Sequence, residues 1–345
     1  MSTPVLTGEQ AVMVASWRSG GLSWQACAVR LGRNEASLRR AMKRFDVPNF
    51  AATDDMPPTT RSAREDEAPV AVRVPMVAAA APPSVRPSSD LEKILVIPDT
   101  HVPFEDGAAF AVLMAAARVV RPHTVVFLGD FADFMSVSFH PRELGRRGYT
   151  LKEEADAVNA RLDEIQTLGA QRVVFIKGNH EYRLERYLTE KAPELFGLVD
   201  TKALFRFADR GWECVEYRQH LKIGKMHFTH DVGHAGIYAH RQSRMAYEGN
   251  VVIGHVHRLA YEVAGTSKGP AHVGIALGWL GDKGAIDYMH AAKASQWTLG
   301  FGVAYHERDT GNVHVTPVPI VDYRCVVEGV IVDPLKGTSA DKRVA

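Results

Sequence analysis

The chain has 345 residues, of which 46% are hydrophobic and 23% charged, a composition typical of a soluble globular protein. Its 41 Lys and Arg nearly balance its 40 Asp and Glu, which excludes a chain that is polybasic or polyacidic as a whole, and three Cys exclude a disulfide scaffold or a multi-cysteine zinc ribbon. No run of 18 apolar residues exists and residues 1–9 lack a signal-peptide pattern, so we expect a cytoplasmic protein with no membrane partner.

Residues 1–46 are predicted to form a small basic helical domain. They hold seven Lys and Arg against three Asp and Glu, an excess of positive charge that the rest of the chain offsets. Ser23 is a suitable N-cap for one helix, Gly32 would end that helix with a turn, and Asn34 would cap the next one. Two short helices joined at a glycine, with an earlier helix over Val5–Trp17, predict a helix-turn-helix domain.

The second helix of this domain would carry basic side chains on its outer positions. Such side chains neutralise phosphates and reach guanine edges in the major groove, so we predict that the domain binds DNA. The alternative is a helical bundle that serves dimerisation or binds a protein partner, with a solvated basic face. The predicted DNA contacts are Arg33, Arg39, Arg40, Lys43 and Arg44.

Residues 47–90 are predicted to be a disordered linker. They contain 8 of the 18 prolines together with an alanine run and many Ser and Thr, and no hydrophobic period survives there. Each proline removes a backbone donor that a helix or a sheet would need. An ordered arm wrapped on the following domain is the alternative.

From residue 91 the pattern alternates between strands and helices. Short, continuous apolar runs are typical of strands that are buried on both faces. The expected strands are Lys93–Pro98, Thr124–Leu128, Arg172–Ile176, Lys225–Thr229 and Val251–Ile253, and the expected helices are Ala108–Val120, Leu151–Leu168, His180–Glu190 and Gly236–Tyr247. Beyond about residue 258, β-rich segments dominate up to Val332. The pattern predicts a layered α/β domain over residues 91–333 and a flexible tail over residues 334–345.

Five short polar motifs follow one another along this domain: Asp99–His101, Gly129–Asp133, Gly178–Glu181, Thr229–His230 and Gly254–His257. The first three each come after an expected strand, and the carboxyl ends of strands are where α/β sheets bind ligands. Taken singly, each motif is explained by a turn, a helix cap or a core histidine. Together, their carboxylate, imidazole and amide groups suit two divalent metals such as Mn, Fe, Zn or Ni, with Asp130 as the natural bridging ligand.

The ordered set resembles the calcineurin-like metallophosphoesterase family, from about Ile94 to His257 by motif. The resemblance implies a four-layer β-sandwich of two sheets flanked by helices. It also implies two metal ions, with Mn²⁺ the first choice and Fe, Zn, Ni or Mg as alternatives. One metal would be held by Asp99, His101, Asp130 and His257, and the other by Asp130, Asn179, His230 and His255.

The same resemblance assigns the remaining roles in the site. His180 would protonate the leaving oxygen or stabilise the transition state, and Asp133 and Glu181 would orient the ligand histidines. A hydroxide that bridges the two metals would attack phosphorus in line.

Several segments are similar to the phosphoesterases of bacteriophages and prophages, which would place the protein in the host cytoplasm. They are Gly129–Phe134, Ser136–His140, Gly178–Arg183 and Trp297–Phe301. Two departures from the wider family matter. Asp231 follows His230 where a glycine is frequent, and no arginine follows the Gly-Asp motif, which argues against a Ser/Thr protein phosphatase. The candidates for an alternative phosphate clamp are Arg142, Arg146, Arg147 and Arg183.

The sequence therefore predicts a two-metal phosphodiesterase that acts on DNA or nucleotides and is recruited to DNA by residues 1–46. One alternative is a phosphomonoesterase or cyclic-nucleotide phosphodiesterase whose N-terminal domain binds a protein partner. Another is a DNA-binding regulator that uses the metal fold as a scaffold. The sequence leaves open whether the chain forms a homodimer.

Overall fold

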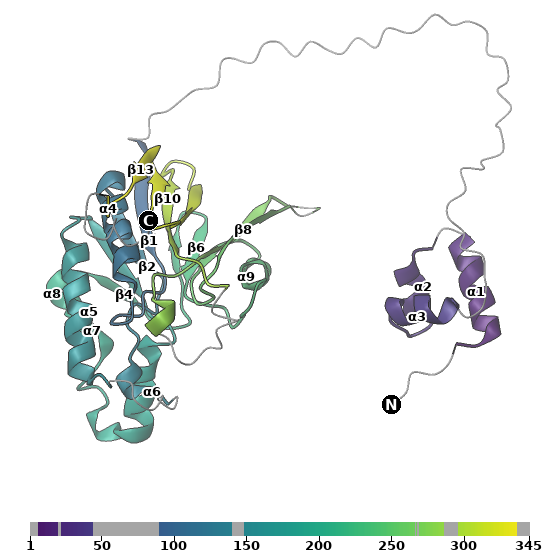
Figure 1. Ribbon diagram of the computed structural model, residues 1–345, viewed down its shortest axis with the longest axis horizontal. Helices are drawn as coiled ribbons and strands as arrows, with labels where there is room; N and C mark the ends of the chain where they lie inside the picture. Colours follow the sequence, from purple (N-terminus) through teal and green to yellow (C-terminus); the bar gives the residue numbers. More distant parts are fainter. Residues whose placement is uncertain are drawn as a thin grey trace, which may run out of the picture. The chain divides into compact units, whose positions relative to one another are not determined.

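The computed structural model (Figure 1) describes residues 6–19, 22–43, 90–139, 148–265, 267, 269–285 and 296–336. The chain divides into two compact units, Met1–Pro83 and Ser84–Ala345, and each is treated by itself below. Almost all of the predicted linker, most of the predicted tail and four of the predicted basic residues lie outside the described residues; those four are Arg44, Arg142, Arg146 and Arg147.

In its described residues, 6–19 and 22–43, the N-terminal unit contains three helices, α1 (Gly8–Ser19), α2 (Trp24–Arg30) and α3 (Glu35–Met42). Ser23 Oγ accepts a hydrogen bond from the Ala26 amide, and Asn34 Oδ1 accepts one from the Ser37 amide, so both predicted caps are present. Between the two helices, Gly32 takes a φ of +62°, which favours glycine. The three helices enclose a small core made of Leu6, Ala11, Val14, Cys27, Ala28, Leu38 and Met42.

The C-terminal unit is built on two mixed sheets. The larger sheet has the order β11-β10-β1-β2-β3-β4, in which β1 to β4 run parallel, β10 pairs antiparallel with β1, and β11 pairs antiparallel with β10. Its strands are β1 (Glu92–Ile97), β2 (Thr124–Phe127), β3 (Arg172–Ile176), β4 (Glu213–Val215), β10 (Gly300–His306) and β11 (Val313–Pro319). The second sheet has the order β5-β6-β7-β9-β8, with strands β5 (Leu221–Ile223), β6 (Met226–Thr229), β7 (Asn250–Ile253), β8 (Leu259–Ala264) and β9 (His272–Leu277). A separate hairpin pairs β12 (Cys325–Val327) with β13 (Val330–Val332).

The two sheets pack face to face, and helices cover their outer faces. Along β1, Ile94 and Val96 join the core between the sheets, whereas Leu95 and Ile97 join the core beneath the helices. This alternation explains why the strand reads as a continuous apolar run. The helices of this unit are α4 (Gly107–Val120), α5 (Leu151–Gln166), α6 (Glu181–Lys191), α7 (Thr201–Leu204), α8 (Phe207–Arg210) and α9 (Ala239–Tyr247), with short 3₁₀ turns at Met135–Val137, Pro193–Leu195 and Lys283–Ala285.

The helices divide between the two outer faces. The core that contains Leu95 and Ile97 also contains residues of α4, α5 and α6, so these helices cover the larger sheet. Ala239 of α9 packs with Val251, Ile253 and Ala276 on the outer face of the second sheet. Among the described residues, no helix combines the length and the apolar character that crossing a bilayer requires.

The direction of the strands gathers the polar motifs at one edge. β1, β2 and β3 are parallel to one another, and β6, β7 and β9 are parallel within the second sheet. All five motifs lie in the segments that directly follow β1, β2, β3, β6 and β7. The topology therefore presents the motifs from both sheets at the carboxyl ends of parallel strands.

Candidate metal centre

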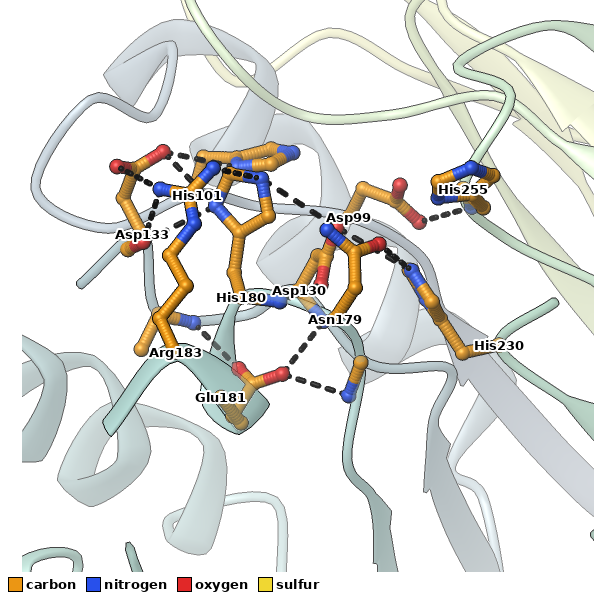
Figure 2. A network of polar contacts seen from close by, with 12 residues as sticks. Asp99, His101, Asp130, Asp133, Asn179, His180, Glu181, Arg183, His230 and His255 are labelled. Carbon is orange, nitrogen blue, oxygen red and sulfur yellow. Dashed lines mark hydrogen bonds and ion pairs between the residues drawn. The ribbon is translucent and has the colours of Figure 1, made fainter. Parts of the chain in front are cut away.

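The structure brings all seven predicted metal ligands into one buried region, and Figure 2 labels all of them except His257. Asp99 and His101 follow β1, Asp130 follows β2, and Asn179 follows β3. His230 directly follows β6 in the second sheet, and the segment after β7 supplies the remaining two ligands, His255 and His257. Asp99, Asp130, His101, His230 and His257 are buried, while His255 is half-buried.

The first cluster consists of Asp99, His101 and His257. His257 Nε2 lies 3.0 Å from Asp99 Oδ2, and His101 Nε2 lies 3.1 Å from His257 Nε2. The ligand atoms of the three residues all lie within 4.8 Å of one another. Two imidazole nitrogens and a carboxylate oxygen thus point at the same small volume.

The second cluster consists of Asp130, His230 and His255, whose ligand atoms again lie within 4.8 Å of one another. His230 Nε2 is 3.2 Å from Asp130 Oδ2 and 2.9 Å from Asn179 Oδ1. Asp130 also forms a third group with His101 and His180, so it lies between the two clusters. This is the place that a bridging carboxylate needs in a two-metal site.

The orientation of two histidines shows that the donor set fits metal ions. The Nδ1 atom of His101 lies 3.1 Å from Asp133 Oδ2, and the Nδ1 atom of His230 lies 2.8 Å from the Leu128 carbonyl oxygen. Each acceptor holds the ring proton on Nδ1 and leaves the Nε2 lone pair directed into the site. Buried lone pairs and carboxylates that converge in this way are stabilised by a cation, so the His/Asp clusters fit a dinuclear metal site.

The histidines keep the buried carboxylates charged. Burial by itself would raise the pKa of Asp130, but the neighbouring His180 and His230 hold that pKa well below its ordinary value. Burial lowers the pKa of His230, yet Asp130 and Asp99 outweigh it and raise the pKa to about 10. Burial and the nearby His180 lower the pKa of His101. The carboxylates are therefore anionic and His101 is uncharged, whereas His230 holds a proton on its ring that a bound metal ion would have to displace.

Four of the seven predicted ligands lie in the left-handed region of the backbone: His101 (φ 57°), Asp130 (φ 50°), His255 (φ 65°) and His257 (φ 55°). Residues other than glycine adopt this region at a cost of about 1–3 kcal/mol each, and such residues cluster at functional sites. The stability of the surrounding fold offsets this cost, and the left-handed backbone directs these four side chains toward the site.

Glycines make room for the ligands at two points. A Cβ on Gly178 would lie 2.1 Å from Asp130 Oδ1, and a Cβ on Gly254 would lie 2.4 Å from Asp99 Oδ1. These two glycines precede Asn179 and His255 in their motifs. The structure gives a reason for glycine there, namely that the carboxylates of Asp130 and Asp99 pack directly against the glycine backbone.

Asp133 and Glu181 act on different partners. Asp133 lies beside His101 Nδ1, as expected, and its Oδ2 atom is also 3.2 Å from His180 Nδ1. The expectation that Glu181 orients a ligand histidine does not fit its contacts. Glu181 accepts hydrogen bonds from the amides of Asp130 (2.9 Å), Ala132 (2.9 Å) and Gly178 (2.7 Å), so it fastens the segment after β2 to the segment after β3.

His180 lies next to the predicted ligands but is held by other groups. Its Nε2 atom is 3.8 Å from Asp130 Oδ2, and its Nδ1 atom is 3.0 Å from the Asp133 carbonyl oxygen. Burial lowers the pKa of His180, but Asp130 and Asp133 outweigh it, and the pKa is raised. The Arg183 guanidinium lies 2.8 Å from His180 Nε2 and also contacts Asp133. Of the four arginines considered for a phosphate clamp, Arg183 is the one that the structure describes, and it lies at the site.

Two further features could be read from the sequence only in part. Trp279 and Trp297 contact His257, and sequence reasoning did not place Trp279 at the site. A signal for it existed, because Trp279 follows β9, and β9 is parallel to its neighbour β7, which the His255–His257 motif follows.

Asp231 accepts a hydrogen bond from the Gly233 amide and so stabilises a tight turn beside His230.

Comparisons with known proteins show the family of this chain. The sequence profile of the family described as calcineurin-like phosphoesterase matches residues 92–305. The Gene 54 protein of Mycobacterium phage D29 is 26% identical over 256 residues, which cover 69% of this chain and 97% of that protein. The Gene 54 protein of Mycobacterium phage L5 is 25% identical over the same shares of the two chains.

Among solved structures, the chain is similar to a single mutant of Vps29 from Entamoeba histolytica, with a TM-score of 0.35 and 16% identity over 69% of this chain and 95% of that one. The phosphoesterase Yfce from E. coli has a TM-score of 0.34 and 15% identity over 65% of this chain and 98% of that one.

Proposed function

This chain belongs to the calcineurin-like phosphoesterase family, and from that premise we propose that it hydrolyses phosphodiester bonds of DNA or nucleotides with two divalent metal ions. One observation carries the proposal: Asp130 belongs to the buried cluster with His230 and His255 and also forms a group with His101, a member of the first cluster. When bound, two divalent ions would supply a strongly nucleophilic water and neutralise charge on the phosphate oxygens. Mn²⁺ remains our first choice of metal.

Each residue of the site then has a role. Asp99, His101 and His257 would hold one ion and Asn179, His230 and His255 the other, with Asp130 shared between them. His180 would donate to the leaving oxygen, because its Nε2 atom faces Asp130 from the edge of both clusters. Arg183 is positioned to bind a phosphate oxygen, since its guanidinium lies beside that same nitrogen.

We further propose that the N-terminal unit is a helix-turn-helix domain that brings the phosphoesterase to DNA. Arg40 and Lys43 on and just after α3 are exposed, as phosphate contacts require. Arg39 is partly engaged within the unit, because it pairs with Glu35 at 2.7 Å and lies over the Trp24 ring. We therefore expect Arg40 and Lys43 to contribute more to binding than Arg39. Tethering a DNA-binding domain to a hydrolase raises the local concentration of substrate.

A hydrolysis panel tests the proposal. The full chain is incubated with plasmid DNA, a chromogenic phosphodiester and a chromogenic phosphomonoester, with Mn²⁺, Ni²⁺, Zn²⁺ or Mg²⁺ added separately. We expect hydrolysis of DNA and the diester, loss of activity on chelation, and less than about 1% activity in Asp130→Asn. The double variant Arg40→Glu, Lys43→Glu should lose DNA cleavage and keep diester hydrolysis.

Other results would redirect the proposal. Hydrolysis of the monoester alone would favour a phosphatase whose N-terminal unit binds a protein. The absence of hydrolysis with every metal, together with retained DNA binding, would favour a non-catalytic regulator.

A further inference from the structure

The ring of His257 is held differently from the rings of His101 and His230. The outer nitrogen of each of those two histidines faces an oxygen atom, from Asp133 and Leu128 respectively. His257 directs Nε2 at Asp99 Oδ2, 3.0 Å away, while its Nδ1 atom is buried and has no hydrogen-bond partner within the described residues. A ligand histidine is normally oriented by a bond at this second nitrogen. Another interaction has to orient this ring.

Two tryptophans enclose the His257 ring. Trp279 is stacked almost parallel to it, with ring centroids 4.9 Å apart and an interplanar angle of 14°. Trp297 approaches almost at a right angle, at 4.3 Å and 84°. The two indoles also contact each other at 4.8 Å, and both are buried. A flat contact on one side and an edge contact on another restrict both tilt and rotation of the imidazole.

Backbone hydrogen bonds fix the tryptophans to the ligand segments. The Thr298 amide donates to the His257 carbonyl oxygen at 2.9 Å, and the Trp279 amide donates to the Thr298 carbonyl oxygen at 3.2 Å. The Leu280 amide then donates to the Asp99 carbonyl oxygen at 2.7 Å. The segments that bear the indoles and those that bear two ligands of the first cluster therefore form one connected network.

The packing of the core beneath the helices does not explain why positions 279 and 297 are tryptophans. Trp279 and Trp297 form a small buried cluster of their own, which meets the core beneath the helices at Leu299. The Trp279 Nε1 atom is buried without a hydrogen-bond partner in the described part of the chain, which is costly and uncommon for an indole. Phenylalanine would fill most of this space without that cost, so stability alone does not favour tryptophan here.

We propose that Trp279 and Trp297 are positioning residues that hold the His257 imidazole toward Asp99 and His101. The inference rests on the proposed metal site. Both indoles contact the His257 ring, and Trp279 also approaches the His101 ring of the same cluster, with centroids 6.2 Å apart. The proposed role is therefore exerted through ligand rings of the first cluster. Removal of the indoles frees the ring of a ligand in the first cluster, whereas the ligands of the second cluster keep their own supports, such as the Leu128 carbonyl oxygen beside His230.

Calorimetric titration of the full-length protein with Mn²⁺ tests the proposal. We expect the wild type to bind two ions. Trp279→Leu and Trp297→Leu should each weaken one of the two sites by about 10- to 100-fold and leave the other unchanged. Trp279→Phe keeps a ring against His257 and should weaken that site by a smaller factor.

A matched control separates positioning from general loss of packing. Trp212→Leu removes an indole that stacks on Phe207, in the core beneath the helices, and should leave both Mn²⁺ affinities unchanged. Wild-type affinity in both Trp279→Leu and Trp297→Leu would overturn the positioning role and leave the proposed function standing. If the wild-type protein binds no Mn²⁺, both the positioning role and the proposed function are overturned. If the leucine variants do not fold, the double variant Trp279→Phe, Trp297→Phe decides, and wild-type affinity there overturns the proposal.

Discussion

Glu181→Gln should loosen the connection between the two segments that carry Asp130 and Asn179. The Glu181 carboxylate is fully buried and accepts three backbone hydrogen bonds, two on Oε2 and one on Oε1. Glutamine keeps one acceptor oxygen and puts an NH₂ group in place of the other. If the amide oxygen keeps the bonds from Asp130 and Gly178, the Ala132 amide faces a second donor and stays unsatisfied.

The loss of stability in Glu181→Gln can be estimated from this one lost hydrogen bond. A buried hydrogen bond to a charged group contributes about 1.5–3 kcal/mol, and an unsatisfied buried donor costs a similar amount. The neutral side chain recovers part of this free energy, because burial and the nearby Asp130 raise the pKa of Glu181 to about 7 and so disfavour its charged form. We expect the free energy of unfolding to fall by about 1.5–2 kcal/mol, and Mn²⁺ affinity to fall about 10-fold because Asp130 and Asn179 lose their fixed positions.

The assay combines urea unfolding with a calorimetric Mn²⁺ titration, and it needs a control of comparable instability. Leu162→Ala removes a fully buried side chain of α5 and should cost about 2–5 kcal/mol without touching the site. A normal Mn²⁺ affinity in Leu162→Ala beside a weakened one in Glu181→Gln supports the reasoning. If Glu181→Gln has the same free energy of unfolding and the same Mn²⁺ affinity as the wild type, Glu181 does not fix the ligand positions. The same conclusion follows if Leu162→Ala weakens Mn²⁺ binding equally.

Two further predictions follow from close contacts. Gly178→Ala places a Cβ 2.1 Å from Asp130 Oδ1 and should weaken Mn²⁺ binding at least about 10-fold, whereas Gly107→Ala meets nothing within 4 Å and should leave the titration unchanged. Equal affinities in both variants would contradict the packing argument. Hydrogen bonds from His306 and Thr124 outweigh burial and lower the pKa of Glu92 to about 2, so Glu92→Gln should cost stability near neutral pH. That cost should shrink as pH falls from 4.5 toward about 2, because the Glu92 carboxylate stabilises the fold only while it is ionised. Urea midpoints measured at a series of pH values check this sign, and a loss of stability that does not change with pH would refute it.

Features that depend on neighbouring residues could be predicted from the sequence. The caps at Ser23 and Asn34 involve partners three residues away, and the structure contains both. The strands that precede the polar motifs were predictable too, because a strand buried on both faces has to be apolar throughout. Since parallel strands end at a common edge, the convergence of the motifs followed from the same pattern.

Features that depend on distant partners could not be predicted in this way. Glu181 lies beside His180 in a motif that suggested a role near histidine, yet its carboxylate bonds to amides about 50 residues away. Nothing in the local pattern distinguishes a carboxylate that orients an imidazole from one that fastens two backbone segments together. The antiparallel pairing of β10 with β1 is equally non-local, and it places Phe301 and Val303 in the core beneath the helices.

The supports of the ligands differ more than the ligands do. His101 is oriented by a carboxylate, His230 by a backbone carbonyl and His257 by two indoles, although all three present Nε2 to the site. The ligand has to offer an atom that divalent metals bind, whereas the outer side of the ring can be held by groups of different chemistry. The sequence motifs therefore indicated the ligands and one support, Asp133, but not the Leu128 carbonyl oxygen or the two indoles. We therefore expect substitutions of the supporting residues to weaken metal binding partially, whereas substitution of a ligand removes a metal-binding atom.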